Sequence, residues 1–211
     1  MQLPDFDLAA EVRIAATYAD ADAWLVDGLV KMIRQRDPIT ASHLDAVGLF
    51  ARRLAATLDL DPETVERIAT AARLCDIGKQ TISLDILNKP GVLDEPEWDQ
   101  IRRHADYGAT IVAGFPQLGR YSAIVRAHHE RVDGRGYPDG LLGNEIPCEA
   151  RIIAVADAFH AMTVSRPYSR VRTPALALGE LMNCAGTQFE PEYVEAFIKM
   201  IGYRRRGLRS A

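Results

Sequence analysis

The chain has few of the features that mark membrane, secreted or nucleic-acid-binding proteins. No apolar run approaches the roughly 20 residues that a membrane-spanning helix needs. The first seven residues carry acids and no basic segment of the kind that opens a secretion signal. Only three cysteines occur, at positions 75, 148 and 184, and an odd number argues against a disulfide framework. The net charge of −4 supplies no general positive field. We therefore expect a cytoplasmic protein without nucleic-acid or membrane partners.

The composition is that of an ordinary globular protein. The 211 residues are 48% hydrophobic and 26% charged, which suffices for one sizeable core. Apolar residues recur at intervals of three and four over most of the chain, and few segments alternate as strands do. The spacing therefore predicts an all-α fold.

Proline, glycine and capping residues divide this pattern into helices and one irregular segment. The irregular segment, about 133–147, is rich in glycine. The predicted helices cover about 8–36 with a break near 19–22, 40–58, 61–78, 94–112, 121–129 and 152–161, and one or two more fill 174–201.

Three parts of the chain are expected to differ in role. Residues 1–35 form an N-terminal helical segment that serves as a linker or as the helix of a homodimer, and residues 36–203 form the main domain. The tail, 204–211, is basic, and in an acidic protein it is a solvated end rather than a nucleic-acid site.

Four of the five histidines fall on helix faces that otherwise carry core residues, as do two aspartates. Burying an unpaired carboxylate costs several kcal/mol, so the aspartates need cationic or donor partners. The inward-facing residues are His43, Asp76, His104, His128, His129 and Asp157.

Two explanations fit these buried polar residues. In the first, each is satisfied locally: Asp76 pairs with Lys79, and Asp157 pairs with Arg151 or His160. For any single residue this explanation is the more common one. In the second, imidazoles and carboxylates from several helices converge on divalent cations. Six such residues in one bundle favour the second explanation.

Mixed nitrogen and oxygen ligands suit iron, manganese or zinc. Such a centre activates water and neutralises phosphate oxygens, which is the chemistry of phosphoester hydrolysis. Lys79 and Arg166 are candidate phosphate contacts. The glycine-rich segment lacks the P-loop pattern. It either shapes a site, with Tyr137 as an aromatic wall, or is a purely structural loop.

These residues resemble the HD-GYP domains, a subgroup of the HD-superfamily metal-dependent phosphohydrolases. The resemblance runs from about Arg36 to Glu192, and its most specific part is the string H-H-E-x-x-D-G-x-G-Y-P. The other matching strings are Arg36-Asp37-Pro38 with His43, Asp76-Ile77-Gly78-Lys79, His104 with Gly108, Arg151 leading to Asp157, Ala161-Met162-Thr163 and Arg166-Pro167-Tyr168.

The resemblance implies an HD-type helical bundle with an irregular Gly-Tyr-Pro loop that hydrolyses cyclic di-GMP to pGpG or GMP. It implies two or three metal ions, a sensory domain or signalling partner, and catalytic roles for Asp76, which bridges the metals, and for Lys79. Because of the departures described below, we expect one to two iron, manganese or zinc ions. The implied metal positions are His43, Cys75, Asp76, His104, His128, His129 and Asp157, and the implied substrate contacts are Lys79, Gly136, Tyr137, Pro138 and Arg166.

The sequence departs from the family's pattern at four positions. Cys75 replaces the histidine of the His-Asp pair, and it either ligates as a thiolate, which favours zinc, or is a buried thiol that ligates nothing. Ile39 replaces a glutamate of the three-metal subset, His160 an aspartate, and Ser169 a basic residue. A second hypothesis is therefore a catalytically degenerate domain that binds a nucleotide or a protein and signals. The retention of the other ligands and of Lys79 favours the enzyme.

Overall fold

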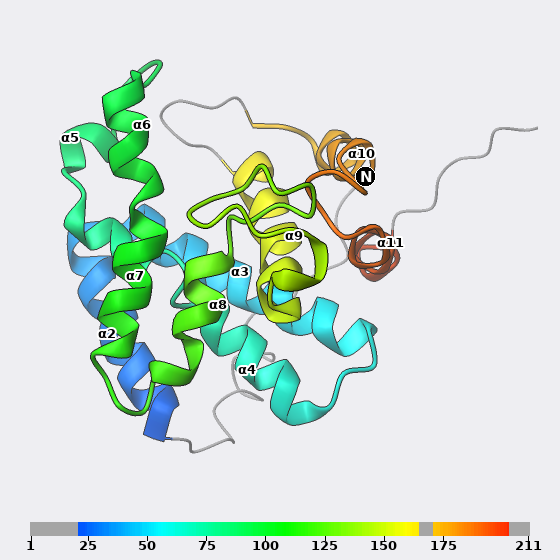
Figure 1. Ribbon diagram of the computed structural model, residues 1–211, viewed down its shortest axis with the longest axis horizontal. Helices are drawn as coiled ribbons and strands as arrows, with labels where there is room; N and C mark the ends of the chain where they lie inside the picture. The colour runs from blue at the N-terminus through cyan, green and yellow to red at the C-terminus, as the bar shows by residue number, and fades with distance from the viewer. Residues whose placement is uncertain (1–20, 165–170, 203–211) are drawn as a thin grey trace, which may run out of the picture.

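The computed structural model describes residues 21–164 and 171–202, and this part of the chain is an all-α bundle, as expected (Figure 1). It contains no strand and only two isolated bridges, Asp133 with Leu142 and Ala185 with Phe189. None of its helices combines the length and the apolar character that crossing a membrane requires. Most of the N-terminal segment and the basic tail lie outside the described residues, so the expected division into three parts stays a prediction.

The helices begin where the sequence provides caps. Asp37, Asp61 and Asp94 each accept hydrogen bonds from backbone N–H groups of the first turn that follows, and a proline stands in that turn. The elements are α2 (Ala21–Arg36), α3 (Pro38–Thr57), α4 (Pro62–Ala72), α5 (Leu84–Leu87), α6 (Glu95–Arg102), α7 (His104–Ala113), α8 (Ser122–Ala127), α9 (Cys148–Thr163), α10 (Pro174–Asn183) and α11 (Pro191–Met200), with the 3-10 helices η1 (Ile77–Thr81), η2 (Gly119–Tyr121) and η3 (Gly143–Glu145).

Helix α3 is the centre of the bundle and packs against α2, α4, α9 and α11 (Figure 1). Its fully buried leucines Leu44 and Leu54 belong to one continuous core with Ile68 of α4 and Phe159 of α9. Helix α7 packs against both α8 and η1. This second contact brings the residues around η1 next to the start of α7.

Two predicted helices are interrupted next to histidines. The helix predicted over 94–112 is divided at Arg103, and His128 and His129 follow α8 rather than lie within it. In both places a histidine ring bonds a carbonyl three residues earlier: the Nδ1 atom of His104 lies 2.6 Å from Ile101 O, and that of His128 lies 2.6 Å from Val125 O. In an unbroken helix each of these carbonyls would accept from the backbone N–H four residues further on. The histidine side chains therefore compete with continuation of the helix.

The third predicted helix ends at Ala72 instead of Gly78, and Ile77–Thr81 form η1. Gly78 allows η1 to touch the backbone of α7. A Cβ atom on Gly78 would lie 1.9 Å from the carbonyl oxygen of His104 and 2.6 Å from the nitrogen of Gly108. This approach holds Asp76, two residues earlier, against the start of α7.

We expect Gly78→Ala to lower the free energy of unfolding by at least about 2 kcal/mol, because the added methyl group overlaps backbone atoms that have no room to move. The matched control is Gly28→Ala in α2, where a Cβ atom meets nothing within 4 Å. It should raise stability by about 0.5–1 kcal/mol, as glycine is a poor helix former. Urea unfolding measures both, and equal stability of the two variants would contradict the close contact.

Candidate metal centre

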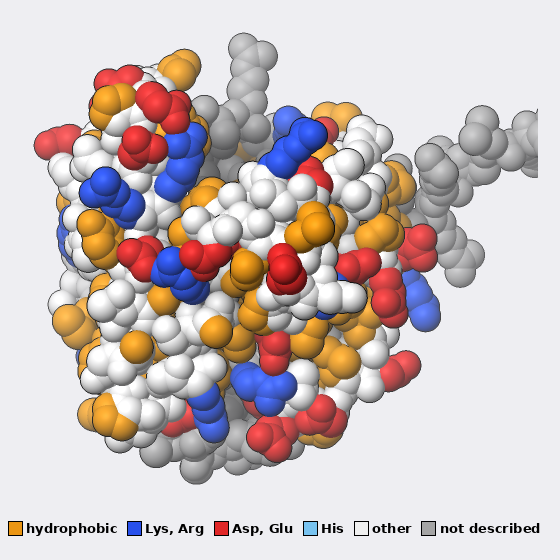
Figure 2. All heavy atoms as spheres, in the orientation of Figure 1, with side chains coloured by type: hydrophobic (Ala, Val, Ile, Leu, Met, Phe, Trp, Pro, Cys, Tyr) orange, Lys and Arg blue, Asp and Glu red, His pale blue; other side chains and the backbone are white. Residues whose placement is uncertain are grey.

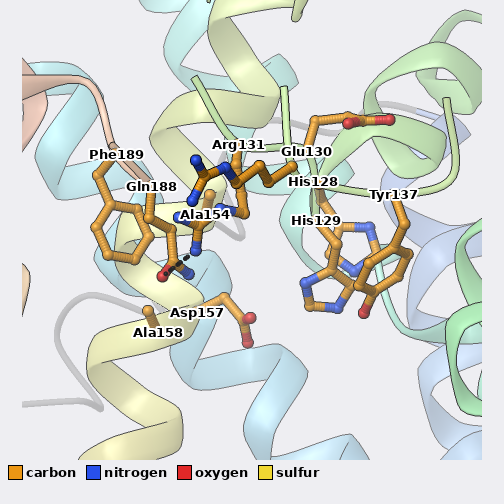
Figure 3. Close-up of a pocket in the computed structure, with 12 residues that line it drawn as sticks. His128, His129, Glu130, Arg131, Tyr137, Ala154, Asp157, Ala158, Gln188 and Phe189 are labelled. Atoms are coloured by element: carbon orange, nitrogen blue, oxygen red, sulfur yellow. Dashed lines mark hydrogen bonds between the residues drawn. The ribbon is translucent and has the colours of Figure 1, made fainter. Parts of the chain in front are cut away.

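Four side chains from three places in the bundle converge on one point. They are Asp76 before η1, His104 at the start of α7, and His128 and His129 after α8; Figure 3 shows the last two beside a pocket. Each offers one ligand atom, and these atoms all lie within 4.8 Å of one another. Asp76, His104 and His128 are at most 2% exposed. We refer to these four residues as the histidine–aspartate cluster.

When the rings of His104 and His128 are neutral, the cluster brings together atoms that accept hydrogen bonds, with no donor hydrogen between them. A carbonyl oxygen only accepts, so the Nδ1 atoms of His104 and His128 carry the hydrogens that point to Ile101 and Val125. In neutral rings the two Nε2 atoms are then lone-pair acceptors, yet they lie 3.2 Å apart. The Oδ1 atom of Asp76 lies 3.2 Å from His104 Nε2 and 3.9 Å from His128 Nε2. A cation between these atoms would satisfy all of them.

The environment of the cluster favours the protonation states that bind metal. Burial, together with the nearby ring of His104, lowers the pKa of His128 to about 4, and burial holds the pKa of His129 well below its ordinary value. Burial opposes the ionisation of Asp76, but the charged groups around it, Lys79 above all, keep the pKa of this carboxyl well below its usual range. Near neutral pH His128 and His129 are therefore neutral imidazoles and Asp76 is an anionic carboxylate.

These pKa shifts predict how the stability of metal-free protein depends on pH. An unfolded chain takes up protons at histidine near pH 6.5, whereas folded His128 remains neutral down to about pH 4. The unfolded state binds more protons in this window, so stability should fall by at least about 2 kcal/mol from pH 7 to pH 4.5. Unfolding of chelator-treated protein measures this, and His128→Asn should flatten the slope. A pH-independent stability of the native sequence would contradict the burial of neutral rings.

His43 and Asp157 lie beside the cluster but bond to other side chains. The Nε2 atom of His43 lies 2.7 Å from Asp157 Oδ1 and 3.6 Å from Asp76 Oδ2, and its Nδ1 atom lies 2.7 Å from His160 Nδ1. A carboxylate only accepts, so Nε2 carries the hydrogen and Nδ1 accepts from His160. Burial opposes the charge on Asp157, but this bond with His43 keeps its pKa well below the usual range. Both nitrogens of His43 are thus used by protein partners.

The local pairs predicted from the sequence are found only in part. Lys79 Nζ lies 2.7 Å from Asp76 Oδ2, as expected. Arg151 pairs with Glu190 at 2.7 Å and not with Asp157, because residues six apart on α9 lie on different faces of the helix. His160 bonds His43, which in turn bonds Asp157.

Cys75 is buried next to Asp76, with 1% of its surface exposed. Burial and the negative charges of Asp76 and Asp157 raise the pKa of its thiol well above the ordinary value. Its sulfur is not among the ligand atoms that converge within the described residues. Ile39, one helical turn before His43 on α3, is 51% exposed.

A pocket opens directly beside the cluster. In Figure 3 the rings of His129 and Tyr137 stand on one side and Gln188 and Phe189 on the other, with Asp157 between them. The centroids of the His129 and Tyr137 rings lie 4.9 Å apart. Ala154 and Ala158, one helical turn apart on α9, also line the pocket and leave it room.

The predicted substrate contacts are only partly placed at this pocket. Gly136 and Tyr137 line it, whereas Pro138 is exposed and is absent from its lining. Lys79 is not part of the pocket lining; its ammonium group donates to Asp76 in the cluster. Arg166, like Ser169, lies outside the described residues.

Glu130 has a role that sequence reasoning missed. Its side chain is buried and accepts hydrogen bonds from the backbone N–H groups of Asp139, Gly140 and Leu141. A Cβ atom on Gly136 would lie 2.4 Å from Glu130 Cα, so the loop packs directly on this residue. The available signal was an acid placed directly after two inward-facing histidines. Glu130 fixes the loop that carries Tyr137.

Arg36 was also missed as a structural anchor. Its guanidinium group donates to the carbonyl oxygens of Lys79, Gln80 and Ile82 at 3.2, 2.8 and 2.6 Å. These bonds hold η1, and with it Asp76 and Lys79, against the end of α2.

The fold and the site define a class: an all-α protein whose buried histidines and aspartate have the donor set of a hydrolytic metal centre. The chain belongs to the HD domain family, whose model matches residues 28–193. This confirms the family that the sequence resembles.

Two curated relatives are cyclic-dinucleotide phosphodiesterases. The chain is 41% identical over 175 residues to the cyclic di-GMP phosphodiesterase response regulator RpfG of Xanthomonas campestris pv. campestris, covering 81% of this chain and 46% of the relative. It is 37% identical over 177 residues to 3'3'-cGAMP-specific phosphodiesterase 2 of Vibrio cholerae, covering 83% and 34%. The chain thus spans less than half the length of these relatives.

Among solved structures, Bd1817, a HDG"Y"P protein from Bdellovibrio bacteriovorus, has a similar fold. The TM-score is 0.67 at 18% identity, and the match covers 86% of this chain and 64% of Bd1817. At this identity the likeness supports the fold alone.

Proposed function

We propose that this chain is a metal-dependent phosphodiesterase that hydrolyses cyclic di-GMP to pGpG or GMP. The observation that carries the proposal is the convergence of imidazole nitrogens and a carboxylate oxygen in the histidine–aspartate cluster, beside an open pocket. The substrate class follows from the relatives, whose names give cyclic dinucleotides as their substrates.

The cluster residues Asp76, His104, His128 and His129 would hold one divalent ion, iron, manganese or zinc. When bound, the ion supplies Lewis acidity that activates water and neutralises phosphate charge. A single ion is proposed because His43 already donates to Asp157 and accepts from His160, and because Cys75 offers a protonated thiol. His43, Cys75 and Asp157 then support the cluster without ligating.

Lys79 and Tyr137 would act on the substrate directly. The Lys79 ammonium group is held by Asp76 at the edge of the cluster, where it is placed to contact the scissile phosphate and to steady the leaving oxygen. Tyr137 supplies an aromatic wall for a base or sugar, and Gly136 lets that wall stand close to Glu130. Contacts from Pro138 and Arg166 remain predictions.

The degenerate signalling domain is the alternative, and Cys75 is the observation that favours it. The two functions separate in one experiment. Protein loaded with manganese or iron is incubated with cyclic di-GMP and, in parallel, with 3'3'-cGAMP, and the products are resolved by chromatography while metal content is measured on the same sample. We expect pGpG or GMP from cyclic di-GMP and no product after chelation. Binding of cyclic di-GMP without any product would reject the enzyme in favour of the signalling domain.

A further inference from the structure

One arginine in the pocket lining forms no ion pair with an acidic side chain of the described residues. Two arginines line the pocket. Each side-chain nitrogen of Arg131 donates one hydrogen bond: two go to the Asp133 oxygens, at 3.0 and 2.7 Å. The third goes to the Gln188 side-chain oxygen at 3.0 Å (Figure 3). Arg135 is exposed, and its guanidinium group forms no ion pair within the described part of the chain.

Two further cations, one at the cluster and one at the loop, are also held by carboxylates. Lys79 pairs with Asp76, and Arg126 pairs with Asp106 and Asp139. The face seen in Figure 2 shows acidic and basic side chains interspersed, so no broad positive field covers it. Of the two arginines described in the pocket lining, Arg135 is therefore the one without a carboxylate partner, and it can meet an anion that extends beyond the cluster.

The backbone of Arg135 is fixed although its side chain is exposed. Gly134, before it, has a φ of +74°, and Gly136, after it, packs against the backbone of Glu130. The N–H of Arg135 donates to Asp133 Oδ1 at 3.1 Å. The loop thus presents the guanidinium group from a rigid support, which reduces the ordering cost of binding a ligand.

A cyclic dinucleotide carries two phosphodiester groups on opposite sides of its ring. When one lies at the cluster and Lys79, the other lies away from it and needs a second cation. We propose that Arg135 binds this second, non-scissile phosphate, with the two N–H groups of its guanidinium fork on the phosphate oxygens. The inference rests on the proposed function and adds a specificity contact for substrates that carry two phosphates.

The test is steady-state hydrolysis of cyclic di-GMP by metal-loaded protein carrying Arg135→Ala or Arg135→Lys, with Arg34→Ala as the control. Arg34 is also a partly exposed arginine, but it lies on α2 and pairs with Asp45. Arg135→Ala should raise KM about tenfold with little change in kcat, because the lost charge-assisted bonds are remote from the scissile bond. Arg135→Lys should recover part of the loss, since lysine keeps the charge but not the fork. Arg34→Ala should shift KM less than about twofold.

Salt adds a readout that a merely structural role would not move. The KM of the native protein should rise with salt more steeply than that of Arg135→Ala, because one phosphate contact is missing in the variant. An unchanged KM for Arg135→Ala, in a native protein that does hydrolyse cyclic di-GMP, would overturn the inference alone. A native protein that neither binds nor hydrolyses cyclic di-GMP would overturn the proposed function and this inference with it.

Discussion

His104→Ala is expected to lower the rate of cyclic di-GMP hydrolysis by at least about a hundredfold, together with the amount of bound metal. His104 Nε2 lies within 3.2 Å of both Asp76 Oδ1 and His128 Nε2, so its removal opens the centre of the histidine–aspartate cluster. The helical content should persist, because His104 lies at a helix start and the core around α3 does not depend on it. Activity, metal content and circular dichroism on the same preparation measure the three effects.

The matched control is His160→Gln. His160 bonds His43 rather than a cluster residue, and a glutamine can still donate to His43. This variant should keep its metal and lose less than about threefold in rate. Unaltered metal content in His104→Ala would contradict the assignment of the cluster, whatever happens to the rate.

Cys75→His is expected to raise the bound metal from one ion per chain to two and to increase the rate at least about tenfold. Cys75 lies beside Asp76, and the charges of Asp76 and Asp157 already act on its thiol. An imidazole there adds a neutral lone-pair donor, which allows Asp157 and His43 to exchange their mutual bond for a second ion.

Cys148→His is the control for an added imidazole, since Cys148 is only partly buried and bonds Glu149 outside the cluster. The Cys148→His variant should have the hydrolysis rate of the native protein and gain no second ion in the cluster. A native protein that already holds two ions, and loses one in Cys75→Ser, would show instead that the thiolate ligates and would contradict the single-ion proposal.

The fold class and the inward-facing residues were predictable because helical periodicity alone determines which side chains share a face. The ends of α6 and α8 were not, since they depend on histidine rings that take carbonyls from the helix backbone. Hydrogen-bonding side chains of this kind interrupt a pattern that apolar spacing continues. Gly78 was expected to end a helix, whereas its actual role is a backbone contact with a residue 26 positions later.

The sequence also could not separate the histidine–aspartate cluster from the neighbouring His43 and Asp157. It predicted that six inward-facing residues are held by cations rather than by one another. In the structure four ligand atoms converge at the cluster, whereas His43 bonds Asp157 and His160, which lies 117 residues away. That cations hold His43 and Asp157 stays a prediction. The pairing of His43 with Asp157 and His160 depends on how α3 packs against α9 and has no signature in local sequence. Glu130 was missed for the same reason, since its partners are backbone groups of a loop.

The most direct test of the account is the anomalous difference density of a crystal grown with excess manganese. The account predicts one peak, in contact with Asp76, His104, His128 and His129, and a bond between His43 and Asp157 that persists. Density showing only water and direct side-chain bonds among these four residues, or a second peak of equal height between His43 and Asp157, would contradict it.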